Sequence, residues 1–187
     1  PVVVTREILA ELKELTPLAP LHQPHNLAPI EAIFQRLPDV PQVACFDTSF
    51  HRGHSAVATV VPLPRDLCWY GIERYGFHGL SHAYVARRTA ELTAARRIVT
   101  CHLGAGASLA AVLDGRSVDT TMGFTPLEGI VMATRSGSVD PGLLLWLLKN
   151  SDLTATEVEA ALEHESGLAA LAGSADMREV IARSERG

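Results

Sequence analysis

The segment RIVTCHLGAGASLAAVLDGRSVDTT, residues 97–121, decides the expected fold. It opens with a β-branched run typical of a central strand and then reaches a glycine-rich turn at Gly104, Ala105 and Gly106. A second apolar stretch, 108–113, is followed by Asp114-Gly115, a strong hairpin signal that leads into a third strand. We therefore predict a three-stranded meander over this segment.

Helical spacing of apolar residues predicts helices before the meander, over residues 5–16, 30–37 and 81–92. Residues 17–29 contain four prolines and are expected to form an irregular loop. The run from Val43 to Phe46 is expected to be a short buried strand.

Capping signals predict three further helices after the meander. Asp140 can cap a helix that opens with Pro141, and Thr154 with Glu157 forms a capping box. This second helix should run to about residue 164, with Gly167 able to close it. A last helix is expected over residues 175–184, capped by Ser174.

Charge and apolar content are ordinary for a soluble globular protein. The chain has 187 residues, with 16 Lys and Arg against 21 Asp and Glu, and 47% of its residues are apolar. A formal net charge of −5 disfavours nucleic-acid binding. No apolar run reaches the ~18–20 residues that span a bilayer. Three widely spaced cysteines without a C-x-x-C pair indicate a reduced cytoplasmic protein with buried thiols.

Two short segments could bind a phosphate and its metal ion. Asp47 follows the expected strand at 43–46, where a carboxylate could hold Mg²⁺ or accept a proton, or could simply cap a turn. The turn at Gly104 and Gly106 could bring backbone N–H groups close to a phosphate, or could be a plain tight hairpin.

Two other segments carry a candidate donor and a candidate cation. His78 stands between Gly76 and Gly79 and could donate to a developing negative charge, or could be structural. Arg135 lies in the charge-poor stretch 122–142 and could clamp a carboxylate or phosphate. The alternative is that Arg135 pairs with one of two nearby carboxylates, Glu128 or Asp140.

Paired histidines leave a metal-binding protein open as a further alternative. Three pairs have separations of three or four residues: His22/His25, His51/His54 and His78/His82. Such spacing can mimic a zinc site, although no Cys or acidic partner follows in a zinc-like pattern.

Several segments, taken together and in order, resemble the acetate kinase family. They are FDTSFH (46–51), YGFHGLSH (75–82), HLGAGAS (102–108) and VDTTMGFTPLEGIVMATRSGSVDPG (118–142). The flanking pieces LAPLHQPHNLAPIEAI and HESGLAALAGSADMREV are similar as well. The resemblance runs essentially from residue 1 to residue 183.

This resemblance implies an α/β fold of two ribonuclease-H-like domains, as in actin-like ATPases. Residues 1–54 would be the C-terminal portion of the first domain, and residues 55–187 the N-terminal portion of the second, joined by the Gly-, Pro- and aromatic-rich stretch 52–77. The implied reaction moves the γ-phosphoryl group of ATP to acetate with Mg²⁺, reversibly, in a cytoplasmic homodimer. Propionate or butyrate kinases, and a non-catalytic remnant that binds nucleotide or a partner, remain alternatives.

The resemblance also assigns roles to individual residues. Asp47 would position Mg²⁺, through a water molecule, and His78 and Arg135 would contact the transferring phosphoryl group. The implied nucleotide-phosphate loop consists of His102, Gly104, Ala105 and Gly106, and the implied acetyl pocket of Leu21, Phe77 and Pro126.

Three positions depart from the family pattern. Ala105 replaces the usual Asn of the phosphate turn, Ser138 replaces an Asp, and Gln23 replaces an Asn. Family members are also longer at both ends, so we expect this chain to be an internal part of one, and inactive by itself. These differences are what keep the non-catalytic alternative open.

Overall fold

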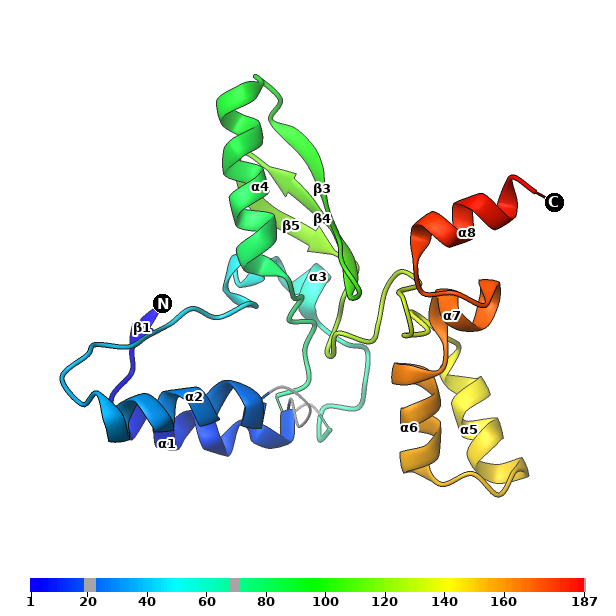
Figure 1. The fold of residues 1–187 in the computed structure, drawn as a ribbon, viewed down its shortest axis with the longest axis horizontal. Coiled ribbons are helices and arrows are strands. Elements are labelled where there is room, and N and C mark those ends of the chain that lie inside the picture. The colour runs from blue at the N-terminus through cyan, green and yellow to red at the C-terminus, as the bar shows by residue number, and fades with distance from the viewer. Residues whose placement is uncertain (19–22, 68–70, 187) are drawn as a thin grey trace. The chain divides into compact units, whose positions relative to one another are not determined.

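The computed structural model describes residues 1–18, 23–67 and 71–186 and separates two compact units, Pro1–Phe46 and Asp47–Gly187 (Figure 1). These units are defined within this chain alone, so the domain assignment implied by the family resemblance stays a prediction. In the described ranges, no helix combines the length and the apolar character needed to cross a membrane.

The first unit is a pair of helices beside a two-stranded sheet. Helix α1 (Arg6–Glu14) begins as predicted at Thr5, whose hydroxyl accepts a hydrogen bond from the Ile8 N–H, and it packs on α2 (Gln23–Arg36). The 3₁₀ turn η1 (Thr16–Leu18) follows α1, and strands β1 (Val2–Val3) and β2 (Val43–Ala44) pair antiparallel. The core of this unit contains Val4, Leu9, Leu12 and Leu27.

Two predictions for this unit are wrong. Helix α2 begins at Gln23 rather than at residue 30, and it contains Pro24 and Pro29. Pro24 is tolerated because the first-turn N–H groups of a helix have no helical partner, and burial of Leu27 in the core favours extending the helix past Pro29. The β2 strand is not buried, since Val43 is 58% exposed in a sheet of only two strands.

The predicted meander is confirmed in the second unit. Strands β3 (Arg97–Leu103), β4 (Ala107–Leu113) and β5 (Arg116–Thr120) form an antiparallel sheet in the order β3-β4-β5. The pairing of Leu103 with Ala107 closes the glycine-rich turn. The central strand is β4 and not the one at residues 97–103, because two successive tight turns place β4 between its neighbours.

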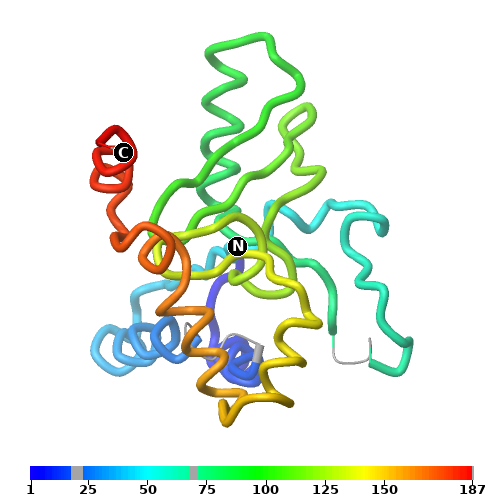
Figure 2. The backbone as a smooth tube through the Cα atoms, turned by 90° about the vertical axis from the view of Figure 1, so that its right-hand side faces the viewer, coloured from blue at the N-terminus to red at the C-terminus, as the bar shows by residue number. Residues whose placement is uncertain are grey.

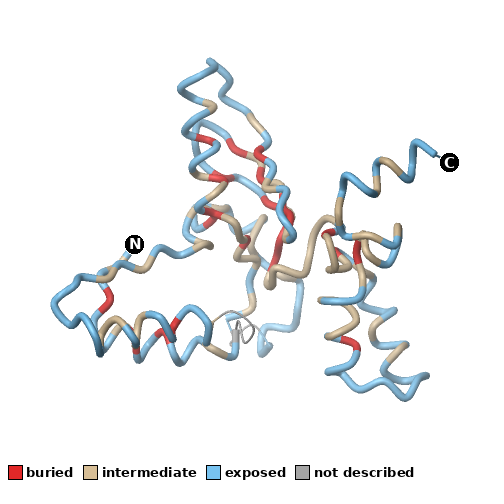
Figure 3. The backbone as a smooth tube through the Cα atoms, in the orientation of Figure 1, coloured by how far each residue is buried: buried red, intermediate tan, exposed pale blue. Residues whose placement is uncertain are grey.

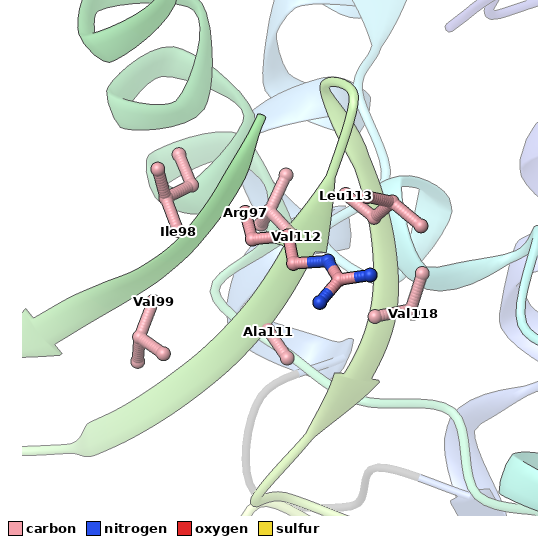
Figure 4. A pocket seen from close by; sticks show the side chains of 7 residues that line it. All are labelled: Arg97, Ile98, Val99, Ala111, Val112, Leu113 and Val118. Atoms are coloured by element: carbon pink, nitrogen blue, oxygen red, sulfur yellow. The ribbon is translucent and has the colours of Figure 1, made fainter. Parts of the chain in front are cut away.

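Helix α4 (Gly79–Leu92) packs on one face of this sheet, and Figures 1 and 2 show the two side by side. Alternate residues of β3 divide between the faces, as a pleated strand requires: Thr100 is buried on the α4 side, whereas Val99 is 65% exposed. Cys101 is also exposed, as is Cys45 in the first unit, so the prediction of buried thiols is wrong at both. Figure 4 shows a shallow apolar groove lined by Arg97, Ile98, Val99, Ala111, Val112, Leu113 and Val118.

A small second core joins the glycine-rich turn to the stretch 122–142. Ala107, Met122 and Met132 are buried together, and Phe77 and Ile130 pack against them. Figure 3 colours the buried positions of the chain red. Because Ala107 directly follows the turn and Met132 directly precedes the Arg135 segment, this core brings the turn and that segment together.

Short helices complete the unit. The 3₁₀ turn η2 (Ser49–His51) and helix α3 (Ala56–Thr59) precede α4, and the C-terminal helices are α5 (Pro141–Asn150), α6 (Ala155–His164), α7 (Gly167–Ala172) and α8 (Met177–Ser184).

Local capping signals located two of these C-terminal helices correctly. The Asp140 cap of α5 and the capping box of α6 are confirmed. Gly167 does not close α6 but begins α7, at φ +66°. The cap of α8 is Asp176, since the Ser174 hydroxyl accepts a bond from the Asp176 N–H instead of capping the helix.

Gly79 gives a direct test of the packing around the start of α4. A Cβ atom at this position would overlap the backbone carbonyl oxygen of Asp47. We predict that Gly79→Ala lowers the free energy of unfolding by ~1–3 kcal/mol, despite the better helix propensity of alanine. Urea denaturation measures the change.

The matched control is Gly53→Ala, because a Cβ atom there would meet no atom within 4 Å. Equal stability of the two variants would contradict the packing described at α4.

Candidate active site

The start of α4 is held by Asp47. The carboxylate oxygen Oδ2 of Asp47 accepts a hydrogen bond from the backbone N–H of His78 at 2.6 Å. The backbone carbonyl oxygen of Asp47 accepts one from the N–H of Gly79 at 2.8 Å. His78 caps the helix with φ 58° and ψ 23°, in the left-handed region. Such a conformation costs a non-glycine residue ~1–3 kcal/mol, so the two bonds from Asp47 stabilise a strained turn.

The imidazole of His78 is fixed on two sides. Its Nδ1 atom lies 2.9 Å from the hydroxyl oxygen of Ser108, on β4. Its ring stacks on that of His102, with centroids 4.0 Å apart and planes at 19°. The His102 ring is held in turn by the hydroxyl of Ser81, 2.9 Å from its Nδ1 atom. The sequence therefore brings two of the predicted site residues, His78 and His102, face to face.

Several neighbours act on the charge of His78. Burial lowers the pKa of its imidazole, and the nearby His102, Arg135 and His51 lower it further. The carboxylate of Asp47 acts in the opposite direction and raises it. An anion bound beside this ring would add to the effect of Asp47 and favour the protonated form.

The glycine-rich turn lies against three candidate side chains. A Cβ atom on Gly106 would stand 3.3 Å from Nε2 of His78 and 3.2 Å from Nη1 of Arg135. A Cβ atom on Gly104 would stand 3.2 Å from Nε2 of His102. Glycine at both positions thus leaves the space that a larger side chain would enter, next to two imidazoles and a guanidinium.

Arg135 is anchored by a carboxylate that the sequence did not indicate. Its Nε atom pairs with Oε2 of Glu163 at 3.0 Å, and its Nη1 donates to the carbonyl of Pro126 at 3.3 Å. The predicted alternatives are wrong: Glu128 pairs with Arg74 at 2.9 Å, and Asp140 caps α5. Pairing through Nε holds the guanidinium while its Nη1 edge faces Gly106.

The remaining candidate residues lie close to these groups. The carbonyl of Ala105 accepts the N–H of Ala133 at 3.2 Å, which ties the turn to the Arg135 segment. Phe77 packs on the small second core, next to His78. Leu21 lies outside the described residues.

Two of the three histidine pairs bind hydroxyl groups, and His22 of the third pair lies outside the described residues. His51 and His54 share the hydroxyl of Ser117, at 2.8 and 2.7 Å, and His82 lies between the hydroxyls of Thr100 and Ser108, each 2.8 Å away. In the part of the chain that the structure describes, no three His, Cys, Asp or Glu side chains are grouped so as to hold a metal ion. This arrangement gives no support to the histidine-based metal protein.

The donor chemistry of Asp47 fits magnesium. Mg²⁺ prefers carboxylate oxygens, keeps several of its waters, and is commonly bound by one or two carboxylates plus the phosphates of a substrate. A single carboxylate at the backbone of His78, whose ring lies against the glycine-rich turn, has the donor chemistry that magnesium requires.

Comparison with solved structures defines the class of fold. A propionate kinase from Francisella tularensis superimposes with a TM-score of 0.94 at 39% identity, over 100% of this chain and 49% of that protein. An acetate kinase from Porphyromonas gingivalis gives 0.90 at 41% identity, over 100% of this chain and 48% of that one. The chain thus has the actin-like α/β fold of these carboxylate kinases.

Sequence comparison then identifies the family. The acetokinase family model matches residues 1–187, and the chain belongs to this family. It is 50% identical to an acetate kinase of Rhodopseudomonas palustris over 190 aligned residues, which cover 99% of this chain. The chain spans about half the length of the curated relatives it matches, 48% in that case.

Buried histidines predict an acid-sensitive fold. His82 is 1% exposed, and burial lowers its pKa to about 4, with the neighbouring histidines contributing. Its folded pKa thus lies below its unfolded value, so the unfolded state binds more protons between the two. The contribution of neutral, buried His82 to the free energy of unfolding is fully present above pH ~7 and is lost as the pH falls toward 4. We predict a loss of ~2 kcal/mol in unfolding free energy from pH 7.5 to pH 5, measured by urea denaturation.

The comparison variants are His82→Gln, which should flatten this pH dependence, and His25→Gln at an exposed position, which should leave it unchanged. Equal stability of the unaltered chain at the two pH values would contradict the neutral, buried state of His82.

Proposed function

We propose that the complete gene product carrying this chain transfers the γ-phosphoryl group of ATP to acetate, reversibly, giving acetyl phosphate and ADP. One observation carries the proposal: the imidazole of His78 and the guanidinium of Arg135 flank the same glycine, Gly106, in the glycine-rich turn. The names of the relatives support the choice of acetate.

The residues of the chain suit phosphoryl transfer, which needs positioning and charge neutralisation more than covalent help. Arg135, fixed by Glu163, and protonated His78 would donate hydrogen bonds to the oxygens of the transferring group. His102 and the backbone of Gly104, Ala105 and Gly106 would contact the nucleotide phosphates. Magnesium, held by Asp47, would supply further neutralisation of the phosphate charge.

No strong base is required for this reaction. The carboxylate of acetate is ionised at neutral pH, so one of its oxygens can attack the γ-phosphorus directly. The new bond joins that oxygen to phosphorus, and the bond from phosphorus to the β–γ bridging oxygen breaks, so that ADP leaves with the electron pair. The role of the protein is to align the two oxygens and to stabilise the charge between them.

Propionate is the second candidate substrate, because one structural relative is titled a propionate kinase. Phe77 and Pro126 would line the pocket for the short alkyl group. A single methylene is worth only ~1–3 kcal/mol of discrimination in an apolar pocket. We therefore expect overlapping activity on the two acids, with acetate preferred.

Two of the positions that depart from the family pattern still hydrogen-bond within the site segments, which favours a catalytic protein over a non-catalytic remnant. Ser138 exchanges two hydrogen bonds with Gly129, its N–H to the Gly129 carbonyl at 2.9 Å and the Gly129 N–H to its hydroxyl at 3.1 Å. The backbone of Ala105 is bonded to Ala133. These two of the three substituted positions thus still stabilise the segments that carry the candidate residues. A cytoplasmic homodimer is part of the same proposal.

Hydroxylamine trapping tests this function. The complete gene product is incubated with ATP, Mg²⁺ and acetate, and acyl phosphate is trapped as the hydroxamate; propionate and butyrate replace acetate in parallel. We expect acetyl hydroxamate that depends on ATP and Mg²⁺. Nucleotide binding without any hydroxamate would favour the non-catalytic alternative.

Arg135→Ala in the complete gene product should reduce the rate of acetyl-phosphate formation by at least ~10²-fold, because one charge-neutralising donor is lost. Arg135→Lys keeps the charge but not the paired geometry with Glu163, so we expect it to recover only part of the rate. Steady-state kinetics measures both variants.

The control is Arg178→Ala, whose side chain is 91% exposed and pairs with Asp176 on the surface. A near-normal rate for Arg135→Ala would refute its role, provided that the Arg178→Ala variant also behaves normally.

A further inference from the structure

Ser108 lies between two histidines at the centre of the second unit. Its side chain is fully buried, and its hydroxyl oxygen is 2.9 Å from Nδ1 of His78 and 2.8 Å from Nε2 of His82. A serine hydroxyl has one hydrogen, so it can donate to only one of these nitrogens and must accept a hydrogen bond from the other. The question is therefore which ring carries the proton that faces Ser108.

Thr100 sets the direction from the far side of His82. Its hydroxyl donates to the carbonyl oxygen of Ala110 at 3.4 Å, and the same oxygen lies 2.8 Å from Nδ1 of His82. We infer that this bond uses the hydroxyl hydrogen, so that Thr100 accepts from the Nδ1–H of His82. Burial keeps His82 neutral, with a pKa of about 4, so its Nε2 atom has no proton and accepts the Ser108 hydroxyl.

Ser108 must then accept from His78. The chain of donors runs from His78 Nδ1–H to Ser108, from Ser108 to His82, and from His82 to Thr100. The neutral His78 ring thus carries its proton on Nδ1, and Nε2 is the nitrogen nearest the glycine-rich turn, 3.3 Å from a Cβ atom placed on Gly106.

A second series of hydrogen bonds, argued in the same way, holds the backbone at Phe77 and His78. Nε2 of His51 lies 3.0 Å from the carbonyl oxygen of Phe77, which can only accept, so this nitrogen carries the proton. Nδ1 of His51 then accepts the hydroxyl of the buried Ser117, and Ser117 accepts from Nε2 of His54. This second series of hydrogen bonds therefore ends on the peptide group that joins Phe77 to His78, whereas the first series begins at the His78 ring.

We propose that Ser108 is a positioning residue: with His82 and Thr100 behind it, Ser108 accepts from Nδ1–H of His78, so that the neutral ring is the Nδ1–H tautomer and Nε2 is the nitrogen that takes up a second proton and then donates to a phosphoryl oxygen. The last clause rests on the proposed phosphoryl transfer, whereas the tautomer itself does not. Stacking on His102 fixes the plane of the ring, but only the bond to Ser108 specifies which nitrogen faces the turn.

Nitrogen NMR of the chain labelled at its histidine rings reads the tautomer directly. The signals of His78 are assigned by their loss in His78→Gln, and spectra are recorded at a pH where the ring is neutral. We expect the shift of a protonated nitrogen at Nδ1 and that of a bare nitrogen at Nε2. The reverse pattern, or an even mixture, would overturn the proposal.

Substitutions separate positioning from a merely structural role. Ser108→Ala removes the acceptor, so we expect a mixture of His78 tautomers. Thr100→Val removes only the hydroxyl on the far side of His82 and leaves the His78–Ser108 contact. The direction of the hydrogen bonds is then set less strongly, so we expect a partial mixture of His78 tautomers. The matched control is Ser117→Ala, which removes a buried hydroxyl shared by two other histidines and should leave the His78 tautomer unchanged.

Kinetics of the complete gene product provides the second measurement. Ser108→Ala should lower kcat for acetyl-phosphate formation by ~10-fold or more, with KM values within about twofold, because orientation in the transition state is what is lost. Ser108→Thr, which keeps the hydroxyl, should recover part of kcat and the single tautomer. An unchanged kcat together with an unchanged tautomer in Ser108→Ala would overturn the proposal.

The two measurements distinguish this inference from the function on which it partly rests. A single Nδ1–H tautomer in a protein that forms no acetyl phosphate supports the positioning role and rejects the proposed reaction. Acetyl-phosphate formation by a protein whose His78 carries its proton on Nε2 rejects the positioning role alone.

Discussion

The contact between Asp47 and the start of helix α4 is the constraint on which the rest of the site depends. The carboxylate and the carbonyl of Asp47 accept the N–H groups of His78 and Gly79, and this stabilises a left-handed turn at a histidine. Because Gly79 has no Cβ, the two chain segments can approach closely enough for both bonds to form. The residue proposed to hold magnesium thus also holds the backbone that carries the His78 imidazole.

The charged and polar parts of the site come from elements far apart in the chain, and packing brings them together. The glycine-rich turn follows β3, the small core under it contains Met122 and Met132, and Arg135 is held by Glu163 of α6. Four histidines with lowered pKa values, His51, His54, His78 and His82, take part in hydrogen bonds to serine and threonine hydroxyls. Neutral histidine is well suited to this, because each ring has one donor and one acceptor and so gives a hydrogen-bond chain a direction.

Local signals were sufficient for much of the fold, and they singled out His78, the glycine-rich turn and Arg135, which the structure brings together. The meander at 97–121 and the capping box at Thr154 depend on near neighbours in sequence, and both were predicted correctly. The early start of α2 was missed, since its prolines argue against a helix and only tertiary burial of Leu27 favours it. Glu163 and Ser108 were missed because long-range contacts define their roles: Glu163 stands outside the quoted motifs, and Ser108, the last residue of HLGAGAS, meets His78 across 30 residues of chain.

A crystal structure of the complete gene product with MgADP, aluminium fluoride and acetate tests the central claim most directly, namely that His78, Arg135 and the glycine-rich turn surround one phosphoryl-sized space. The account predicts the fluoride complex between the ADP β-phosphate and the acetate carboxylate, within hydrogen-bond distance of Nε2 of His78 and the guanidinium of Arg135, with the metal ion on the side of Asp47. A fluoride complex bound away from both His78 and Arg135, with these side chains facing only protein, would contradict it.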